Sequence, residues 1–261
     1  MKLVVATDYN IEHWTSACTM VGSSKDDAVL IKVDDRSATR QAVITQLKQK
    51  GYVVLERSSW GAMPPKNALT PSHWDYCDIV VHHAGHSYSC AVDEHGAIEQ
   101  MKKVQSYDMG KQSFDDVGYH YAVSCPGEVI EARDIRFIGS HVKGDNRGKV
   151  GIVLLENLAE AGEAWQQEYS RKSFWQRFKG SMDIAKDAVA FDHATPTKAQ
   201  IAALSALIAT LKEFFNITAL GGHREYQLLA PGNEGRACPG KYGMQVVEEM
   251  RANFGLRAPS K

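Results

Sequence analysis

The chain has 261 residues, of which 44% are hydrophobic and 23% are charged, and its formal net charge at pH 7 is -1. This composition predicts a globular protein with one large domain, or a main domain with a small companion. A nearly neutral charge gives no electrostatic support for binding to nucleic acid or to an anionic membrane.

Residues 1–52 predict a small N-terminal α/β extension. Two apolar runs, at residues 3–7 and 28–33, are typical of strands. The stretch between Ser37 and Gly51 has helical spacing, with the serine available as N-cap and the glycine as the end of the helix. No motif with recognisable chemistry falls here, so we interpret this region as a packing or docking unit.

Stronger signals begin at residue 53. Strands are predicted at residues 77–83, 119–124, 128–133, 149–158 and 217–220, and helices at 97–109 and 196–215. Pro126 and Gly127 form a turn signal that joins two of these strands in a hairpin. The run at 149–158 is continuously apolar, as expected of a central strand, and its Gly151 indicates a close approach of another group. The predicted fold class is α/β, with a central mixed β-sheet flanked by helices.

The helix at 196–215 has the clearest apolar face of the chain. Thr195 is its expected cap and Pro196 its expected first residue. The buried face should consist of Ile201, Leu204, Leu207, Ile208, Leu211 and Phe215. This spacing predicts a helix packed on the core.

Residues 159–190 interleave aromatic and basic side chains. Such a pattern can indicate nucleic-acid binding, but the nearly neutral chain argues against it. We interpret the segment as an amphipathic helical insert that lies over the main domain.

The cysteines divide into four ordinary residues and one candidate for chemistry. An odd number without CxxC spacing argues against a disulfide framework. We expect four of them to be small buried apolar residues: Cys18, Cys77, Cys90 and Cys125. Cys238 instead follows a loop rich in glycine and proline, where functional residues concentrate.

Three candidate metal ligands stand at predicted strand ends or in the following loop: one residue of the His82-His83 pair, His223 and Cys238. Neighbouring strand residues point to opposite faces, so the paired histidines should have different roles. Two imidazoles and a thiolate suit zinc, and three protein ligands with an open fourth position are typical of a catalytic site. A thiol mechanism, with Cys238 as nucleophile and His223 as base, fits the same residues. The residues alone leave both interpretations open.

Five linked motifs resemble, in order, those of the zinc-dependent N-acetylmuramoyl-L-alanine amidases, the family of bacteriophage amidase lysozymes and animal peptidoglycan recognition proteins. The motifs are RSSWGA (57–62), VVHHAGH (80–86), DDVGYHYAVSCPGEVIEAR (115–133), GSHVKGDNRGKVGIVLLEN (139–157) and GGHRE with ACPG (221–240). The resemblance implies an amidase domain over residues 53–261, with a helical insert at about 160–190, behind an extension over residues 1–52.

Residue by residue, the resemblance implies one Zn²⁺ per chain, bound by His83, His223 and Cys238. His82 would then face away from the metal. Tyr119 matches a tyrosine beside the metal, which would donate a hydrogen bond to the oxyanion of the reaction.

The resemblance also implies residues that contact the substrate. Arg236 replaces a lysine of the phage enzymes and would act as an electrostatic clamp on the oxyanion or on a substrate carboxylate. His120, His141 and Asn146 would contact sugar and peptide, and either histidine could supply the proton for the leaving nitrogen.

The implied function is hydrolysis of the amide bond between N-acetylmuramic acid and L-alanine in bacterial peptidoglycan, by a water molecule that zinc activates. One alternative is a recognition module that binds peptidoglycan without cutting it, although such family members typically lose the cysteine ligand. A thiol peptidase or a structural metal protein is the other alternative.

The apolar stretch in the first ten residues is too short for the core of a signal peptide or for a membrane span. We therefore expect synthesis in the cytoplasm and action in the periplasm or outside the cell, after release by a phage holin or a secretion system. An immunity protein or a component of a secretion apparatus would be a further partner. Neither nucleic acid nor membrane insertion is expected.

Overall fold

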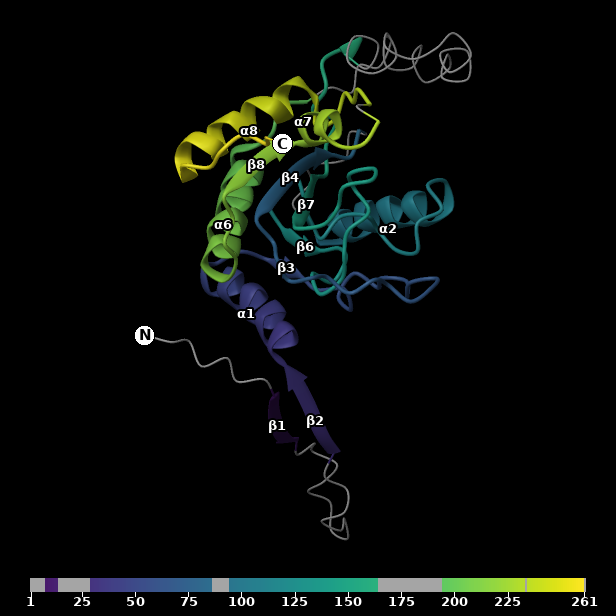
Figure 1. Ribbon diagram of the computed structural model, residues 1–261, viewed down its shortest axis with the longest axis vertical. Helices are drawn as coiled ribbons and strands as arrows, with labels where there is room; N and C mark the ends of the chain where they lie inside the picture. The colour runs from purple at the N-terminus through teal and green to yellow at the C-terminus, as the bar shows by residue number, and fades with distance from the viewer. Residues whose placement is uncertain (1–7, 14–28, 86–93, 164–193, 233, 261) are drawn as a thin grey trace.

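A six-stranded mixed sheet forms the centre of the computed structural model, which describes residues 8–13, 29–85, 94–163, 194–232 and 234–260 (Figure 1). The strand order is β3-β6-β5-β7-β4-β8. Their bounds are β3 Val54–Leu55, β4 Asp78–His83, β5 Tyr121–Val123, β6 Val129–Glu131, β7 Lys149–Leu154 and β8 Ala219–Gly222. Only the hairpin of β5 and β6 is antiparallel among the neighbouring pairs of this sheet. The predicted α/β class with a mixed sheet is confirmed.

Helices cover both faces of the sheet. Their bounds are α1 Asp35–Gln49, α2 Glu94–Gly110, α6 Lys198–Phe214, α7 His223–Leu229 and α8 Gly240–Phe254. Figure 1 shows α6 and α8 on one face and α2 on the other. The apolar residues of β7 alternate accordingly: Val150, Ile152 and Leu154 pack in the core beneath α6 and α8, whereas Val153 packs in the core beneath α2. Burial on both faces explains why this strand is a continuous apolar run.

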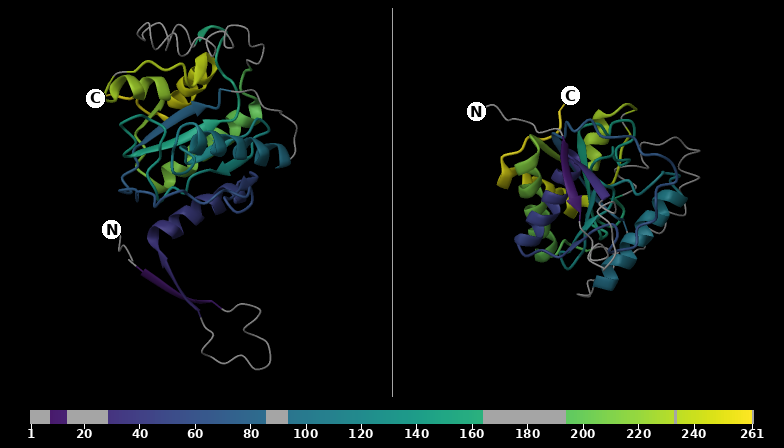
Figure 2. Two further views of the ribbon diagram at one scale, coloured as in Figure 1. Left: turned by 90° about the vertical axis from the view of Figure 1, so that its right-hand side faces the viewer. Right: turned by 90° about the horizontal axis from the view of Figure 1, so that it is seen from below.

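The N-terminal strands and helix α1 differ in how they contact the central sheet. β1 (Asp8–His13) and β2 (Val29–Asp34) form an antiparallel pair, which extends away from the main body in Figure 1 and Figure 2. α1, in contrast, buries Val43, Ile44 and Leu47 in the same core cluster as the sheet and α6. Helix α1 therefore completes the main core.

Two predicted helix caps are wrong. Ser37 lies inside α1, which begins at Asp35, and its hydroxyl accepts a hydrogen bond from Arg136 instead (2.7 Å). Thr197, rather than Thr195, caps α6 by accepting a hydrogen bond from the backbone N–H of Gln200. Either threonine has the chemistry of a cap, and only the backbone path selects between them.

The cysteine predictions are corrected at two positions. Cys77 is exposed, and Cys125 is buried but disulfide-bonded. Cys18 and Cys90, the predicted strand at 3–7 and residues 164–193 of the aromatic insert lie outside the described residues. Among the described residues, no helix has the length and apolar character needed to cross a membrane.

Candidate metal centre

A cleft of about 1220 Å³ lies at the carboxyl ends of β4 and β8. It collects every predicted site residue except His120; its lining includes His83, Tyr119, His141, Asn146, His223, Arg236 and Cys238. Ligands in open α/β sheets bind at the carboxyl ends of the strands, because loops from several strands meet there. The topology therefore explains why residues far apart in the sequence come together.

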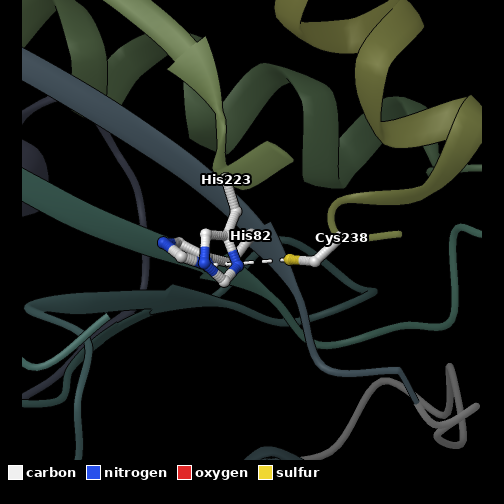
Figure 3. A group of neighbouring side chains, drawn as sticks. All are labelled: His82, His223 and Cys238. Carbon is white, nitrogen blue, oxygen red and sulfur yellow. Dashed lines mark hydrogen bonds between the residues drawn. The ribbon is translucent and has the colours of Figure 1, made fainter. Parts of the chain in front are cut away.

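Three possible metal ligands meet at this end of the sheet. One side-chain donor atom from each of His82, His223 and Cys238 lies within 4.8 Å of the others. Figure 3 shows the two rings side by side, with the sulfur pointing toward His82. The sulfur lies 3.6 Å from Nδ1 of His82.

His82, and not the predicted His83, joins His223 and Cys238 in this group. In the parallel register of β4 and β8, Val81 pairs with Gly222. The next residues, His82 and His223, are therefore level, and their ring centroids lie 4.6 Å apart. His82 therefore replaces His83 as the candidate ligand.

His83 has a different environment, because strand alternation turns it away from His82. Its Nδ1 accepts a hydrogen bond from the backbone N–H of Leu158 (3.1 Å). A neutral ring that accepts at Nδ1 carries its proton on Nε2. His83 is half-buried on the wall of the cleft and outside the group of three.

The chain segments that carry His223 and Cys238 are joined by hydrogen bonds. His223 is the first residue of α7, and the next residue, Arg224, donates its backbone N–H to the carbonyl of Cys238 (2.9 Å). The Arg224 side chain donates to the carbonyl of Ala237 and pairs with Glu163 (2.6 Å). These contacts fix the cysteine next to the end of β8.

The donor set fits a zinc ion. Zinc bonds of about 2.3 Å to sulfur and about 2.0 Å to nitrogen, at tetrahedral angles, place the two donors about 3.5 Å apart. The distance between Cys238 Sγ and His82 Nδ1 is 3.6 Å. Burial lowers the pKa of His82 well below its ordinary value, and the neighbouring His223, His141 and His83 lower it further. His82 is therefore uncharged at neutral pH, the form that binds a metal.

Tyr119 and Arg236 lie on the cleft as predicted. Tyr119 is half-buried, and its ring centroid is 4.9 Å from that of His82. The guanidinium of Arg236 forms an ion pair with Glu234 at 2.8 Å. This pairing holds Arg236 in place and partly offsets its charge.

His120 does not line the cleft, contrary to the prediction of a substrate contact. Its side chain is completely buried, and its Nδ1 accepts a hydrogen bond from the backbone N–H of Gly151 (3.0 Å). Its Nε2 therefore carries the proton and donates to the carbonyl of Phe137 (3.0 Å). Burial lowers the pKa of His120 to about 4. The structure supports a core role for this residue.

His141 and Asn146 reach the cleft but are engaged with the protein itself. Nδ1 of His141 lies 3.2 Å from Nε2 of His82. The Asn146 side-chain oxygen accepts the backbone N–H groups of His141 and Val142, both at 2.8 Å. Asn146 therefore shapes the loop that carries His141.

Sequence reasoning missed Gln227, which is completely buried one helical turn after His223. Its Oε1 lies 3.3 Å from Nε2 of His223, and it also accepts the backbone N–H of Lys143 (2.9 Å). Spacing of i and i+4 on a helix was the available signal, because such residues share one face.

Comparisons with known proteins identify the family of the chain. The profile of the N-acetylmuramoyl-L-alanine amidase family, Amidase_2, matches residues 77–241. Peptidoglycan-recognition protein SD of Drosophila melanogaster is 30% identical over 118 residues, which are 45% of this chain and 62% of that protein. An N-acetylmuramoyl-L-alanine amidase of Sus scrofa is 27% identical over 101 residues, 39% of this chain and 17% of the relative. The chain thus spans less than two thirds of each of these relatives.

Solved structures show the same fold. The crystal structure of Drosophila peptidoglycan recognition protein SD has a TM-score of 0.56 at 20% identity, covering 76% of this chain and 94% of that one. The amidase LysC from Clostridium intestinale has a TM-score of 0.52 at 18% identity, covering 78% and 98%. Because the family profile spans more than half of the chain and these structures share its architecture, the chain belongs to the N-acetylmuramoyl-L-alanine amidase family, Amidase_2.

Proposed function

We propose that the protein is a zinc-dependent hydrolase that cleaves the amide bond between N-acetylmuramic acid and L-alanine in peptidoglycan. The observation that carries the proposal is the group of His82, His223 and Cys238, of which His223 and Cys238 line a large cleft. Three protein ligands that leave a position open toward a cleft are the arrangement of catalytic zinc.

A zinc ion held by these residues would activate water and polarise the amide carbonyl. In the reaction the oxygen of water bonds to the lactyl carbonyl carbon, the bond from carbon to nitrogen breaks, and the alanine nitrogen takes a proton that the water supplies. The Tyr119 hydroxyl would donate a hydrogen bond to the carbonyl oxygen as negative charge develops there.

Other residues of the cleft would bind and orient the substrate. We propose that Arg236, held by Glu234, binds a carboxylate of the stem peptide. His120 is buried away from the cleft, and Nδ1 of His141 faces His82, so we assign neither ring a direct proton transfer to the substrate.

A recognition module that binds peptidoglycan without cutting it is the second candidate. The names of the similar proteins include both recognition proteins and amidases. The presence of Cys238 beside two histidines favours hydrolysis, because a module that only binds has no need of a third metal ligand.

A thiol hydrolase is the third candidate, since Cys238 lies just before the N-terminus of α8, where a helix dipole favours a thiolate. In this structure, however, the sulfur has two imidazoles nearby, as zinc requires.

Digestion of purified peptidoglycan, followed by mass analysis of the products, separates the three candidates. The zinc amidase releases stem peptides with a free amino-terminal alanine, loses this activity on chelation and regains it with zinc. A recognition module binds the polymer without releasing peptide. A thiol hydrolase stays active after chelation and is inactivated by alkylation.

The route to the wall is a separate proposal. Release by a phage holin or a secretion system, and the partners expected there, stay predictions from the sequence, because neither the fold nor the relatives bear on delivery.

A further inference from the structure

A buried pair of histidines joins the candidate metal centre to the sheet beneath it. His82 and His141 have 1% and 6% of their surface exposed, so both rings lie in the protein interior. Nε2 of His82 is 3.2 Å from Nδ1 of His141, while Nδ1 of His82 faces the sulfur of Cys238 (Figure 3). The two nitrogens of His82 therefore face different partners.

Proton placement in this pair follows from the identity of the metal-binding atom. A nitrogen that binds zinc carries no proton, so a neutral His82 bound through Nδ1 has its proton on Nε2. That N–H points at His141, whose Nδ1 must then accept. His141 in turn carries its own proton on Nε2.

Among the described atoms, none is a hydrogen-bond partner of His141 Nε2. The orientation of the His141 ring must therefore be fixed mainly by packing and by its bond to His82.

Two glycines provide that packing. A Cβ atom on Gly139 would lie 2.5 Å from Cδ2 of His141, and a Cβ atom on Gly151 would also lie 2.5 Å from this carbon. Any side chain at either position would collide with the ring, so the glycines leave a space that fits the imidazole. Asn146 fixes the backbone of His141 by accepting its N–H at 2.8 Å.

From this geometry we infer that His141 is a positioning residue of the metal centre: it accepts the Nε2 proton of His82 and so presents Nδ1 to the metal. This assignment replaces the substrate contact that the sequence suggested for His141. It rests on the proposed zinc site, and it predicts an effect on zinc affinity as well as on catalysis.

His120 offers a matched control within the same core. Its ring centroid is 5.8 Å from that of His141, and its side chain is buried away from the cleft. Its hydrogen bonds go to Gly151, Phe137 and Tyr76, and none of them reaches His82, His223 or Cys238. Loss of His120 should therefore lower stability without changing how the metal is held.

The test compares zinc affinity, measured by competition with a chromophoric chelator, in His141→Leu, His141→Asn and His120→Leu. Removal of a partner of a metal-bound histidine typically weakens metal binding about 10–100-fold, which is the result expected for His141→Leu. In His141→Asn the amide oxygen takes the place of Nδ1 as acceptor, so affinity should stay within about threefold of the wild type. His120→Leu should bind zinc like the wild type. Urea unfolding of each apo-protein shows how much of every variant is folded.

A ¹⁵N NMR spectrum of the zinc-loaded wild type tests the same inference without a mutation. It should show His82 protonated at Nε2 and His141 protonated at Nε2, with the Nδ1 of His141 unprotonated. A proton on Nδ1 of His141, or unchanged zinc affinity in folded His141→Leu, would overturn the inference and leave the amidase proposal intact. Failure of the wild type to bind zinc would overturn both.

Discussion

At the scale of single residues, the choice between His82 and His83 decides where the metal binds. Strand alternation shows from the sequence that only one of them can face the metal. Which one does so depends on the register between β4 and β8, which pairs Val81 with Gly222 and sets His82 level with His223. That register joins segments about 140 positions apart, and no local pattern encodes it.

Alanine substitutions of the two histidines test this assignment. His82→Ala removes a ligand itself. Its zinc affinity should therefore fall by more than the roughly 10–100-fold that is typical when a hydrogen-bond partner of a ligand is removed. His83→Ala should still bind one zinc per chain. Metal analysis after dialysis against a weak chelator measures both, and the opposite pattern would restore the assignment to His83.

A second prediction at this scale concerns the hydroxyl group of Tyr119. Tyr119→Phe removes the hydroxyl and keeps the ring that packs 4.9 Å from His82. Loss of one oxyanion donor typically lowers kcat about 10²–10³-fold, and we expect that loss here with zinc content unchanged. Steady-state hydrolysis of a soluble muramoyl peptide measures it; a kcat within a factor of two of the wild type would exclude Tyr119 from the chemistry.

Burial of His120 makes the stability of the folded protein depend on pH. Its pKa is about 4 in the folded protein and about 6.5 when unfolded, so between these values the unfolded chain binds more protons. Stability from this residue is therefore complete above pH 6.5 and is lost as the pH falls toward 4. His120→Asn removes this dependence.

The free energy of unfolding of apo-protein, from urea titrations at pH 7 and pH 5, measures the effect. The difference between wild type and His120→Asn should shrink by about 2 kcal/mol at the lower pH. Burial raises the pKa of Asp108 to about 6, which acts in the opposite sense, but both proteins carry this residue and its contribution cancels. A difference that does not change with pH would mean that His120 is not buried as an uncharged ring.

At the scale of elements, periodicity located most of the sheet and its helices. The apolar run of β7 and the apolar face of α6 are strong signals, because each depends only on local spacing and burial. The helix caps were placed less well, since Ser37 and Thr195 are chemically suitable but lie off the actual helix ends. The approach of Cys238 to β8 depends on hydrogen bonds between loop segments, which periodicity does not describe.

Helix α1 gives a prediction about the N-terminal region. Deletion of residues 1–34 removes the β1–β2 pair and keeps α1, so zinc binding and the unfolding free energy should change little. Deletion of residues 1–52 also removes the buried Val43, Ile44 and Leu47, and burial of three such side chains contributes at least about 5 kcal/mol. Thermal and urea unfolding of the two truncated proteins compare them. Equal stability would show that the main core forms without α1.

At the scale of the whole molecule, the sheet brings distant motifs to one end and leaves the cleft open there. The sequence motifs indicated site residues of which nearly all line the cleft, because residue type and order carry that information. They did not separate residues that face the cleft from residues that support it. His120 and His141 illustrate this limit: both are histidines in motifs that resemble those of the family, yet one is bonded within the core and the other contacts a candidate ligand.

The central claim is tested most directly by zinc titration of the metal-free protein. The readout is the release from peptidoglycan of stem peptides with a free amino-terminal alanine. The account predicts that activity rises in proportion to bound zinc and levels off at one equivalent per chain. Peptide release by the metal-free protein, or a protein with one bound zinc that releases none, would contradict it.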